Sequence, residues 1–490
     1  MNTNKCLYTG AVAGISMFSA LSSIHAQDQE TEKQSKPNIL FIFSDDLTYE
    51  AVGALGMIGV KTPNLDKIMH NGVHFTHAYN MGAWGGAVCV ASRSMLNSGR
   101  FVNRAQDGLK TNPQWAELMK KAGYKTYMTG KWHVPGVNPL FDVVKDVRPG
   151  MPKQTKEGYN RPKDEEDYKN GWKPWDKSKG GYWQGGTHWS KVVADNSIDF
   201  LNQASKEDKP FFMYLAFNAP HDPRQSPKEY IDMYPLDSIK IPKNFLKEYP
   251  YKDAMGCSKR LRDERLAPFP RTEFAVKVQR QEYYAAVTYM DYQIGRILEA
   301  LKKSGKADNT YIFLTADHGI AVGHHGLIGK QNMFDHSMRT PFFIDGPGIK
   351  KGSKNDTPIY LQDIMPTTLA LAGAEIPNWV EFKSLLPILK EDEKNHYNMI
   401  YGKYTDKQRM ILEGDYKLII YPYAKKYLLF NLKKDPDEMN NLADNPEYAS
   451  KLASLKSDFL DLQKKMGDTL DIKNPKPPKN KKRKHNKNKE

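Results

Sequence analysis

Apolar residues along the chain form short uninterrupted runs that alternate with helical patterns. The run at 38–43 is apolar from Ile39 onward, as in a strand buried on both faces. Similar runs predict strands at 124–129, 211–217 and 310–314, and helical periodicity with helix end signals lies between them. Strands that alternate with helices predict a largely parallel sheet covered on both faces. The predicted helices span 63–71, 113–122, 191–203 and 272–303.

The pattern changes near residue 395. Short strands are predicted at 399–401, 410–412, 416–421 and 428–430, with turns between them, and a helix follows at about 449–465. We therefore expect a main domain at 37–394 and a smaller antiparallel subdomain at 395–472. Within the first, residues 136–189 are rich in Gly, Pro, Lys and Trp, which favours a long surface excursion of the kind that often contacts substrates.

The first residues have the pattern of an export signal. Lys5 supplies a positive charge, an apolar stretch covers 11–21, and small residues precede Gln27. This predicts a signal peptide at 1–26, a polar linker at 27–36 and an exported protein, periplasmic or secreted. No later segment reaches the roughly 18 apolar residues of a spanning helix, so no membrane span is expected.

The last residues are strongly basic. Residues 473–490 hold nine Lys or Arg and one acid, so more than half of the formal net charge of +15 lies there. Such a tail could bind a phosphate backbone without sequence preference. The alternative is a solvated, disordered tail. We favour the second interpretation and expect no nucleic-acid partner.

Three cysteines are present. Cys6 falls within the predicted signal, which leaves Cys89 and Cys257. They could pair only if the fold brought them together. If Cys89 has a chemical task, Cys257 is a bystander and there is no disulfide.

Polar, reactive side chains follow four predicted strands. In an open parallel sheet, ligands bind beyond the carboxyl ends of the strands, so these side chains should converge. Carboxylate oxygens suit a hard divalent cation, which favours Ca²⁺ or Mg²⁺ over Zn²⁺, and a histidine would add a nitrogen ligand or a hydrogen bond. The residues at the four ends are Asp45 and Asp46, then Lys131 and His133, then His221, and finally Asp317 and His318.

The stretch from Val88 to Arg100, which contains Cys89-Val90-Ala91-Ser92-Arg93, closely resembles the signature of type I sulfatases. Five further segments occur in the family's order: 44–46, 130–133, 218–221, 317–319 and the segment around Lys330. Residues 429–443 resemble the family's C-terminal part. The resemblance covers about 37–465 and implies an alkaline-phosphatase-like α/β fold, with a large mixed sheet flanked by helices and a smaller C-terminal antiparallel sheet.

The resemblance also implies a modified residue. In that family the cysteine is oxidised during export to formylglycine (3-oxoalanine), by a formylglycine-generating or an anaerobic sulfatase-maturing enzyme. The aldehyde hydrates, one hydroxyl attacks sulfur, and the other expels sulfate. Carried over by position, modified Cys89 would join Asp45, Asp46, Asp317 and His318 as metal ligands, although many members have Asn at the position of His318.

The remaining roles follow from the same resemblance. Arg93 should hold the diol, and Lys131 and Lys330 should bind sulfate oxygens. His133 should assist the elimination, and His221 should protonate the leaving alcohol. Further candidates lie near these motifs and could contact substrate: Trp84, Trp132, His324, His325, Gln331 and Arg339.

The substrate predicted is a sulfated carbohydrate. The segment at 82–86, just before the signature stretch, resembles that of bacterial enzymes that desulfate algal polysaccharides such as ulvan or carrageenan. Within it, Trp84-Gly85-Gly86 could form a sugar-facing wall. Glycosaminoglycans and small aryl or choline sulfates are alternatives.

Two other functions stay open on sequence grounds. One is hydrolysis of phosphonate or phosphate monoesters, a reaction of the same superfamily. The other is binding of sulfated glycans without catalysis, through the basic tail.

Overall fold

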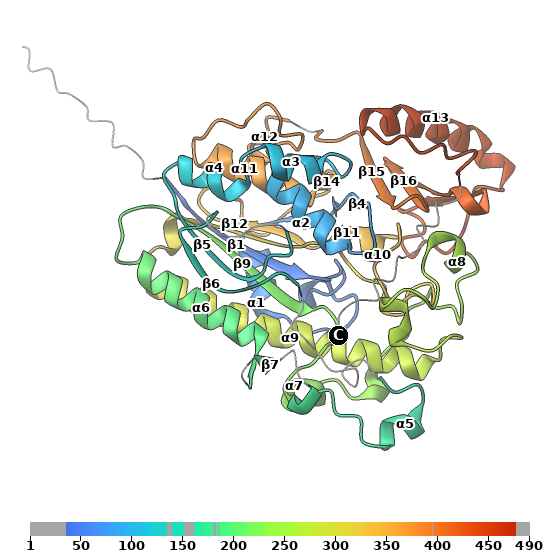
Figure 1. Cartoon of the computed structure of the whole chain (residues 1–490), viewed down its shortest axis with the longest axis horizontal. Helices are drawn as coiled ribbons and strands as arrows, with labels where there is room; N and C mark the ends of the chain where they lie inside the picture. The colour runs from blue at the N-terminus through green and yellow to red at the C-terminus, as the bar shows by residue number, and fades with distance from the viewer. Residues whose placement is uncertain are drawn as a thin grey trace, which may run out of the picture. The chain divides into compact units, whose positions relative to one another are not determined.

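An eight-stranded mixed sheet organises the protein (Figure 1). The computed structural model describes residues 36–134, 140–150, 161–179, 183–184, 186–393 and 395–476. The predicted signal peptide and nearly all of the linker and basic tail lie outside these residues. In spatial order the strands are β13 (Ser353–Asn355), β2 (Val73–Phe75), β12 (Phe342–Asp345), β10 (Thr310–Ala316), β1 (Asn38–Asp45), β9 (Phe211–Pro220), β5 (Lys125–Lys131) and β6 (Val143–Arg148).

Strand β1 shows why the sheet is covered on both faces. All eight of its residues are buried. Leu40 and Ile42 belong to one hydrophobic core, whereas Ile39, Phe41 and Phe43 belong to another. Successive side chains of a strand point to opposite faces, so an unbroken apolar run serves two cores at once.

Helices pack on each face. One core includes residues of α6 (Trp189–Ala204), α9 (Glu273–Lys303) and α1 (Pro63–Asn71). The other includes residues of α2 (Val88–Ser98), α4 (Trp115–Lys121) and α11 (Ile364–Leu371). Figure 1 shows these two groups above and below the sheet. The remaining helices are α3 (Ala105–Thr111), α5 (Glu165–Lys169), α7 (Lys228–Asp232), α8 (Lys252–Met255), α10 (Asp335–Met338), α12 (Leu386–Leu389) and α13 (Ala449–Lys465).

The four central strands are parallel, and their carboxyl ends meet at one edge. Strand β1 pairs in parallel with β9 and β10, and β9 pairs in parallel with β5. Gly130, just before the end of β5, has φ +95°, and a Cβ there would lie 1.9 Å from the carbonyl oxygen of Ala216. Only glycine fits this close approach, which lets β5 pair with β9 up to the residue before Lys131.

A smaller sheet carries the C-terminal residues. Its order is β18 (Lys426–Asn431), β17 (Tyr416–Tyr421), β16 (Gln408–Glu413), β15 (Met399–Tyr404) and β4 (Gly82–Ala83), and α13 contacts β16 and β17. The first four strands are antiparallel, as predicted. Strand β4 comes from the segment that precedes Cys89, so the small sheet is joined directly to that segment. Short strands complete the list: β3 (Ala78–Tyr79), β11 (Arg339–Thr340), β14 (Ile359–Tyr360), β7 (Trp183–Gln184) and β8 (Thr187–His188).

The predicted fold class is confirmed: a large mixed sheet flanked by helices, with a separate smaller sheet. The expectation of a largely parallel sheet holds for the centre, whereas β12 pairs antiparallel with both β10 and β2. In the part of the chain that the structure describes, no helix has both the length and the apolar character needed to cross a bilayer.

Candidate active site

The last residue of β1 and the turn after it carry two carboxylates into the site. Asp45 is the last residue of β1, and Asp46 follows with φ +67°. The Asp46 backbone N–H donates to Asp317 Oδ1 at 3.2 Å, and its carbonyl accepts from Tyr283 Oη of α9 at 2.9 Å. Positive φ is costly for a residue other than glycine, and these contacts on both sides fix the turn.

Helix α2 brings the cysteine to the same place. Cys89 is the second residue of α2 and Arg93 lies one turn further, so both face the same side of the helix. Arg93 Nε lies 3.0 Å from Asp317 Oδ2, and its Nη1 donates to the carbonyl oxygen of Lys131 at 2.7 Å. The guanidinium therefore ties α2 to the ends of β10 and β5.

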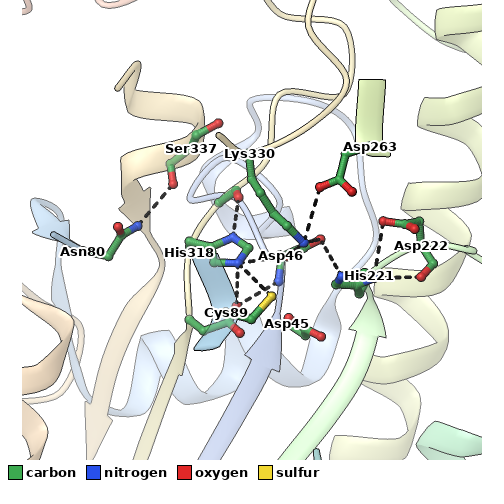
Figure 2. A network of polar contacts seen from close by, with 12 residues as sticks. Asp45, Asp46, Asn80, Cys89, His221, Asp222, Asp263, His318, Lys330 and Ser337 are labelled. Carbon is green, nitrogen blue, oxygen red and sulfur yellow. Dashed lines mark hydrogen bonds and ion pairs between the residues drawn. The ribbon is translucent and has the colours of Figure 1, made fainter. Parts of the chain in front are cut away.

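Five side chains from three strand-end or helix-start segments form one cluster. Figure 2 labels Asp45, Asp46, Cys89 and His318 among them. Their candidate ligand atoms all lie within 4.8 Å of one another, and every residue is buried. The structure thus brings the ends of β1 and β10 together with the start of α2. The five are Asp45, Asp46, Cys89, Asp317 and His318.

This donor set fits a divalent cation. Three carboxylates supply hard oxygen ligands, which suits Ca²⁺ or Mg²⁺. Asp45 Oδ1 is buried without a hydrogen-bond partner, which is unusual unless another group supplies one. Burial and the neighbouring Asp45 both disfavour the charge on Asp46 and act to raise its pKa, whereas Lys330 and His318 act against them. A cation at the cluster would offset that repulsion.

Two lysines neutralise the carboxylates in the structure. Lys131 pairs with Asp45, and Lys330 Nζ lies 2.8 and 2.7 Å from the two oxygens of Asp46. Burial alone would lower the pKa of Lys330, but Asp46 and Cys89 outweigh it and raise the value well above 10.5. Burial would also lower the pKa of Lys131, but Asp45 outweighs it and raises the value. The charged form is therefore favoured for both buried lysines.

His318 contacts the thiol and two carboxylates. Its Nε2 lies 3.3 Å from Cys89 Sγ, 3.2 Å from Asp46 Oδ1 and 3.5 Å from Asp317 Oδ1. Burial opposes the charge, but Asp317, Asp46 and Cys89 raise the pKa of His318 to about 10. The imidazole must lose that proton before its Nε2 can bind a metal.

His221 faces the cluster from the end of β9. Its Nε2 lies 3.8 Å from Asp46 Oδ2, and its Nδ1 lies 2.7 Å from the carbonyl oxygen and 3.3 Å from Oδ1 of Asp222. Burial and the charge of Lys330 hold the pKa of His221 well below 6.5. A neutral ring with Nδ1 anchored in this way presents Nε2 to the site.

His133 follows β5 with φ +61° and is partly buried. Burial and the charges of Lys131 and Arg93 lower its pKa to about 4. Its Nδ1 is buried and has no hydrogen-bond partner among the described residues. The ring is thus neutral near pH 7.

Two family profiles match this chain. The profile of the family described as Sulfatase matches residues 37–374, and that of N-sulphoglucosamine sulphohydrolase, C-terminal, matches 323–465. The chain belongs to the sulfatase family. It is therefore a sulfuric ester hydrolase by family.

Several known sulfatases are similar over most of their length. An arylsulfatase of Clostridium perfringens is 30% identical over 464 residues, which cover 86% of this chain and 93% of that protein. An ulvan-active sulfatase of Formosa agariphila is 26% identical, with 89% and 83% covered.

Two solved structures share the fold. A structure with the bound substrate D-glucosamine-2-N,6-O-disulfate matches with a TM-score of 0.71 at 24% identity and covers 89% of this chain and 99% of that one. A phosphonate monoester hydrolase of Agrobacterium radiobacter matches with a TM-score of 0.69 at 20% identity, with 88% and 96% covered.

Not every predicted substrate residue of the sulfatase lies at the cluster. Trp132 is buried against Phe141 and Tyr214, with ring centroids 5.5 and 5.6 Å apart, so it belongs to the core. Arg339 stacks over the ring of Tyr49 at 4.2 Å and lines a separate hollow with His74 and His77.

Two further candidates form a buried histidine group. His324 Nε2 lies 2.9 Å from Glu50 Oε1, and His325 stacks on Phe334 with centroids 3.9 Å apart. Their contacts are with protein groups rather than with the carboxylate cluster. Trp84 is partly buried beside the small sheet and lines a hollow there.

Gln331 directly follows Lys330 and links it to neighbouring segments through hydrogen bonds. Its Nε2 donates to the Gly86 carbonyl oxygen at 3.2 Å and to Asp263 Oδ2 at 2.9 Å. Asp263, in the 3-10 helix η5 (Asp263–Leu266), also lies 3.9 Å from Lys330 Nζ. Sequence reasoning missed both Asp263 and Asp222. Asp222 had one weak signal, its position directly after His221, whereas Asp263 had none.

Proposed function

We propose that this sulfatase is exported and hydrolyses sulfate esters of carbohydrates through a formylglycine made from Cys89. One observation carries the proposal: Cys89 Sγ lies within 4.8 Å of the ligand atoms of three buried aspartates and a histidine. A buried cysteine among candidate metal ligands, at the start of a helix, fits the position of a nucleophile. Formylglycine would supply, as its hydrate, the hydroxyl that attacks sulfur.

The surrounding cations suit an anionic ester. A sulfate ester repels nucleophiles because it is negatively charged, and fixed positive charges reduce that repulsion. Lys131 and Lys330 would bind the sulfate oxygens. Arg93 would hold the diol, and the ion pair with Asp317 fixes the position of the Arg93 guanidinium. A bound divalent cation would add charge neutralisation at the same cluster.

His221 would protonate the leaving alcohol. An alkoxide leaves poorly, so an acid within hydrogen-bond reach speeds the step. Burial is the main reason that the pKa of His221 is low, and the charges of Lys330 and Lys131 lower it further. An anionic sulfate bound between these lysines would offset their charge and favour the protonated ring. His133, which is neutral, would assist the elimination of sulfate.

Algal polysaccharide sulfate is the substrate class we favour. The ulvan-active relative supports this choice, and the residues at 82–86 lead directly into α2. Ca²⁺ is the metal we propose, with Mg²⁺ as the alternative, on the strength of the oxygen-rich donor set.

The N-terminal pattern supports export. We propose that residues 1–26 are a signal peptide and 27–36 a linker, that a maturing enzyme oxidises Cys89, and that the protein reaches the periplasm or the medium. We also propose 37–394 as the catalytic domain, 395–472 as a C-terminal subdomain and 473–490 as a disordered basic tail.

The test is sulfate release by protein made together with a maturing enzyme. The unsubstituted protein should release sulfate from p-nitrophenyl sulfate or from members of a panel of sulfated oligosaccharides, and Cys89→Ala should release none. Cys257→Ala is the matched control, since that buried thiol contacts Gln331 O rather than the cluster. Phenylphosphonate in a parallel assay separates the phosphonate reaction. Equal sulfate release by the Cys89→Ala protein would reject the proposal.

A further inference from the structure

The loop at 222–226, between β9 and α7, holds buried polar atoms that none of the steps proposed above uses. Four of its five residues have a buried side-chain nitrogen or oxygen without a hydrogen-bond partner among the described residues. Buried polar groups are nearly always paired, so this concentration in one loop indicates a place where another group binds. The atoms are Asp222 Oδ2, Arg224 Nε and Nη2, Gln225 Oε1 and Ser226 Oγ.

Arg224 is the cation of this loop, and neutral groups hold it in one orientation. Its side chain is fully buried, and its Nη1 donates to Gln279 Oε1 of α9 at 2.6 Å. Gln279 is fixed in turn, because its Nε2 donates to the carbonyl oxygen of Leu266 at 2.8 Å. The guanidinium also lies over the ring of Tyr283, 5.6 Å from the centroid. Among the described residues, Arg224 has no ion pair with a carboxylate.

The two unpaired nitrogens of Arg224 form one edge of its guanidinium. On that edge Nε and Nη2 donate in parallel, which matches two oxygens of a carboxylate or a sulfate. A lysine cannot make this paired contact, because its ammonium group acts as a point charge. A buried charge without a counter-charge is costly. An anion bound at this edge would supply both missing acceptors and the counter-charge.

Contacts of Arg224 and its neighbours lead directly to the active site. The Tyr283 ring beneath the guanidinium carries the hydroxyl that donates to the Asp46 carbonyl oxygen at 2.9 Å. His221, the proposed acid, lies three residues before Arg224, and its Nδ1 is 3.3 Å from Asp222 Oδ1. Burial lowers the pKa of Arg224, whereas the charges of Asp222 and Asp46 act against it. The guanidinium therefore lies near the group that would protonate the leaving alcohol.

We propose that Arg224 binds a second anionic group of the substrate, a carboxylate or a further sulfate on the sugar whose sulfate ester is cleaved. The inference rests on the proposed function and narrows its substrate class to sugars with two negative groups. Asp45 and Lys131 are as fully buried as Arg224 and are also expected to meet ligands, so this burial is compatible with the role. The unpaired oxygens of Asp222 and Gln225 would accept from hydroxyls of the same sugar.

Discrimination between matched substrates tests this role. Sulfate release would be measured on a sulfated hexose, on the hexuronic acid sulfated at the same position, and on the corresponding disulfated hexose. The position is one that the oligosaccharide panel shows to be cleaved. We expect the unsubstituted protein to favour a doubly anionic sugar over the sulfated hexose by at least about tenfold in kcat/KM, because a paired contact to a buried guanidinium is strong. Preference for the hexuronic acid identifies a carboxylate, and preference for the disulfated hexose identifies a sulfate.

Two substitutions of Arg224 separate recognition from folding. Arg224→Lys keeps the charge but removes the paired donors, and Arg224→Met removes both. Each should lower kcat/KM for the favoured sugar at least about tenfold. Each should leave kcat/KM for p-nitrophenyl sulfate within about threefold, because that ester has no second anion. Activity on this ester also shows that the variants are folded.

The matched control is Arg296→Lys. Arg296 of α9 pairs with Asp195 of α6 at 2.8 Å, so its replacement should leave the preference unchanged. Three results would overturn the inference: no preference in the unsubstituted protein, a preference that survives in both Arg224 variants, or an equal loss on p-nitrophenyl sulfate. Sulfate release from p-nitrophenyl sulfate by the unsubstituted protein tests the proposed function alone.

Discussion

Lys330 Nζ contacts both carboxylate oxygens of Asp46, at 2.8 and 2.7 Å, in the middle of the cluster that would hold a cation. The same ammonium group is the one expected to bind a sulfate oxygen. A cation at the cluster would take over the neutralisation of Asp46 and leave Lys330 free to turn to the substrate.

Substituting Lys330 should show whether Lys330 and the cation compete for Asp46. In Lys330→Met, Asp46 loses its buried partner, and removing one member of a buried pair costs about 3–5 kcal/mol. We therefore expect a clearly lower Tm in EDTA and a larger rise on adding Ca²⁺ than in the unsubstituted protein. Calorimetry with and without Ca²⁺ checks this. Equal rises in the two proteins would show that Lys330 and the cation do not share Asp46.

Metal binding should stabilise the protein by mass action. A ligand at a hundred times its Kd adds about 2.7 kcal/mol to the free energy of unfolding. Ca²⁺ should therefore raise Tm by a few degrees after EDTA treatment, and Asp317→Asn should abolish most of that rise. Asp308→Asn, at an exposed carboxylate in the 3-10 helix before β10, is the control. A rise that persists in Asp317→Asn would place the cation elsewhere.

His221→Ala should discriminate between leaving groups. Acid assistance contributes about 10²–10⁴-fold where the leaving alkoxide is basic, and little where it is stable. We expect a large loss of kcat/KM for alkyl and sugar sulfates and a small loss for p-nitrophenyl sulfate. Equal losses across a series of leaving-group pKa values would remove the acid role from this residue.

Acid should weaken the ion pair that joins Asp468, after α13, to Arg409 of β16. Burial would raise the pKa of Asp468, but the contact with Arg409 outweighs it and lowers the pKa from 3.8 to about 2. Stability from this pair is present above pH 4 and is lost as the pH falls toward 2, because protonation then breaks the ion pair.

The matching variant is Asp468→Asn. It should lower the free energy of unfolding near pH 7 by at most about 2 kcal/mol, and less where water reaches the pair. Urea titrations at pH 7 and near pH 3 check this. A difference between the two proteins that stays constant over that range would contradict the assignment.

The sequence predicts the framework because its signals are local. The helices at 63–71 and 449–465 begin and end where their end signals and periodicity place them, and the strand at 38–43 is buried on both faces. The four strand ends converge because parallel strands place their carboxyl ends at one edge.

Long-range contacts could not be predicted in the same way. Trp132 follows a strand next to Lys131, yet it packs in the aromatic core with Tyr214. Strand β4 joins a sheet whose other members lie more than 300 residues later. Asp263 reaches Gln331 from a 3-10 helix without any distinguishing pattern. In each case the role depends on a contact with residues distant in the sequence, which the local pattern does not reveal.

Mass spectrometry of the peptide that contains residue 89 is the most direct measurement. The protein should come from cells that supply a maturing enzyme and should be assayed for sulfate release in the same preparation. We predict the lower mass of an aldehyde in place of the thiol, in proportion to activity. A fully active enzyme with an intact Cys89 thiol would contradict the account.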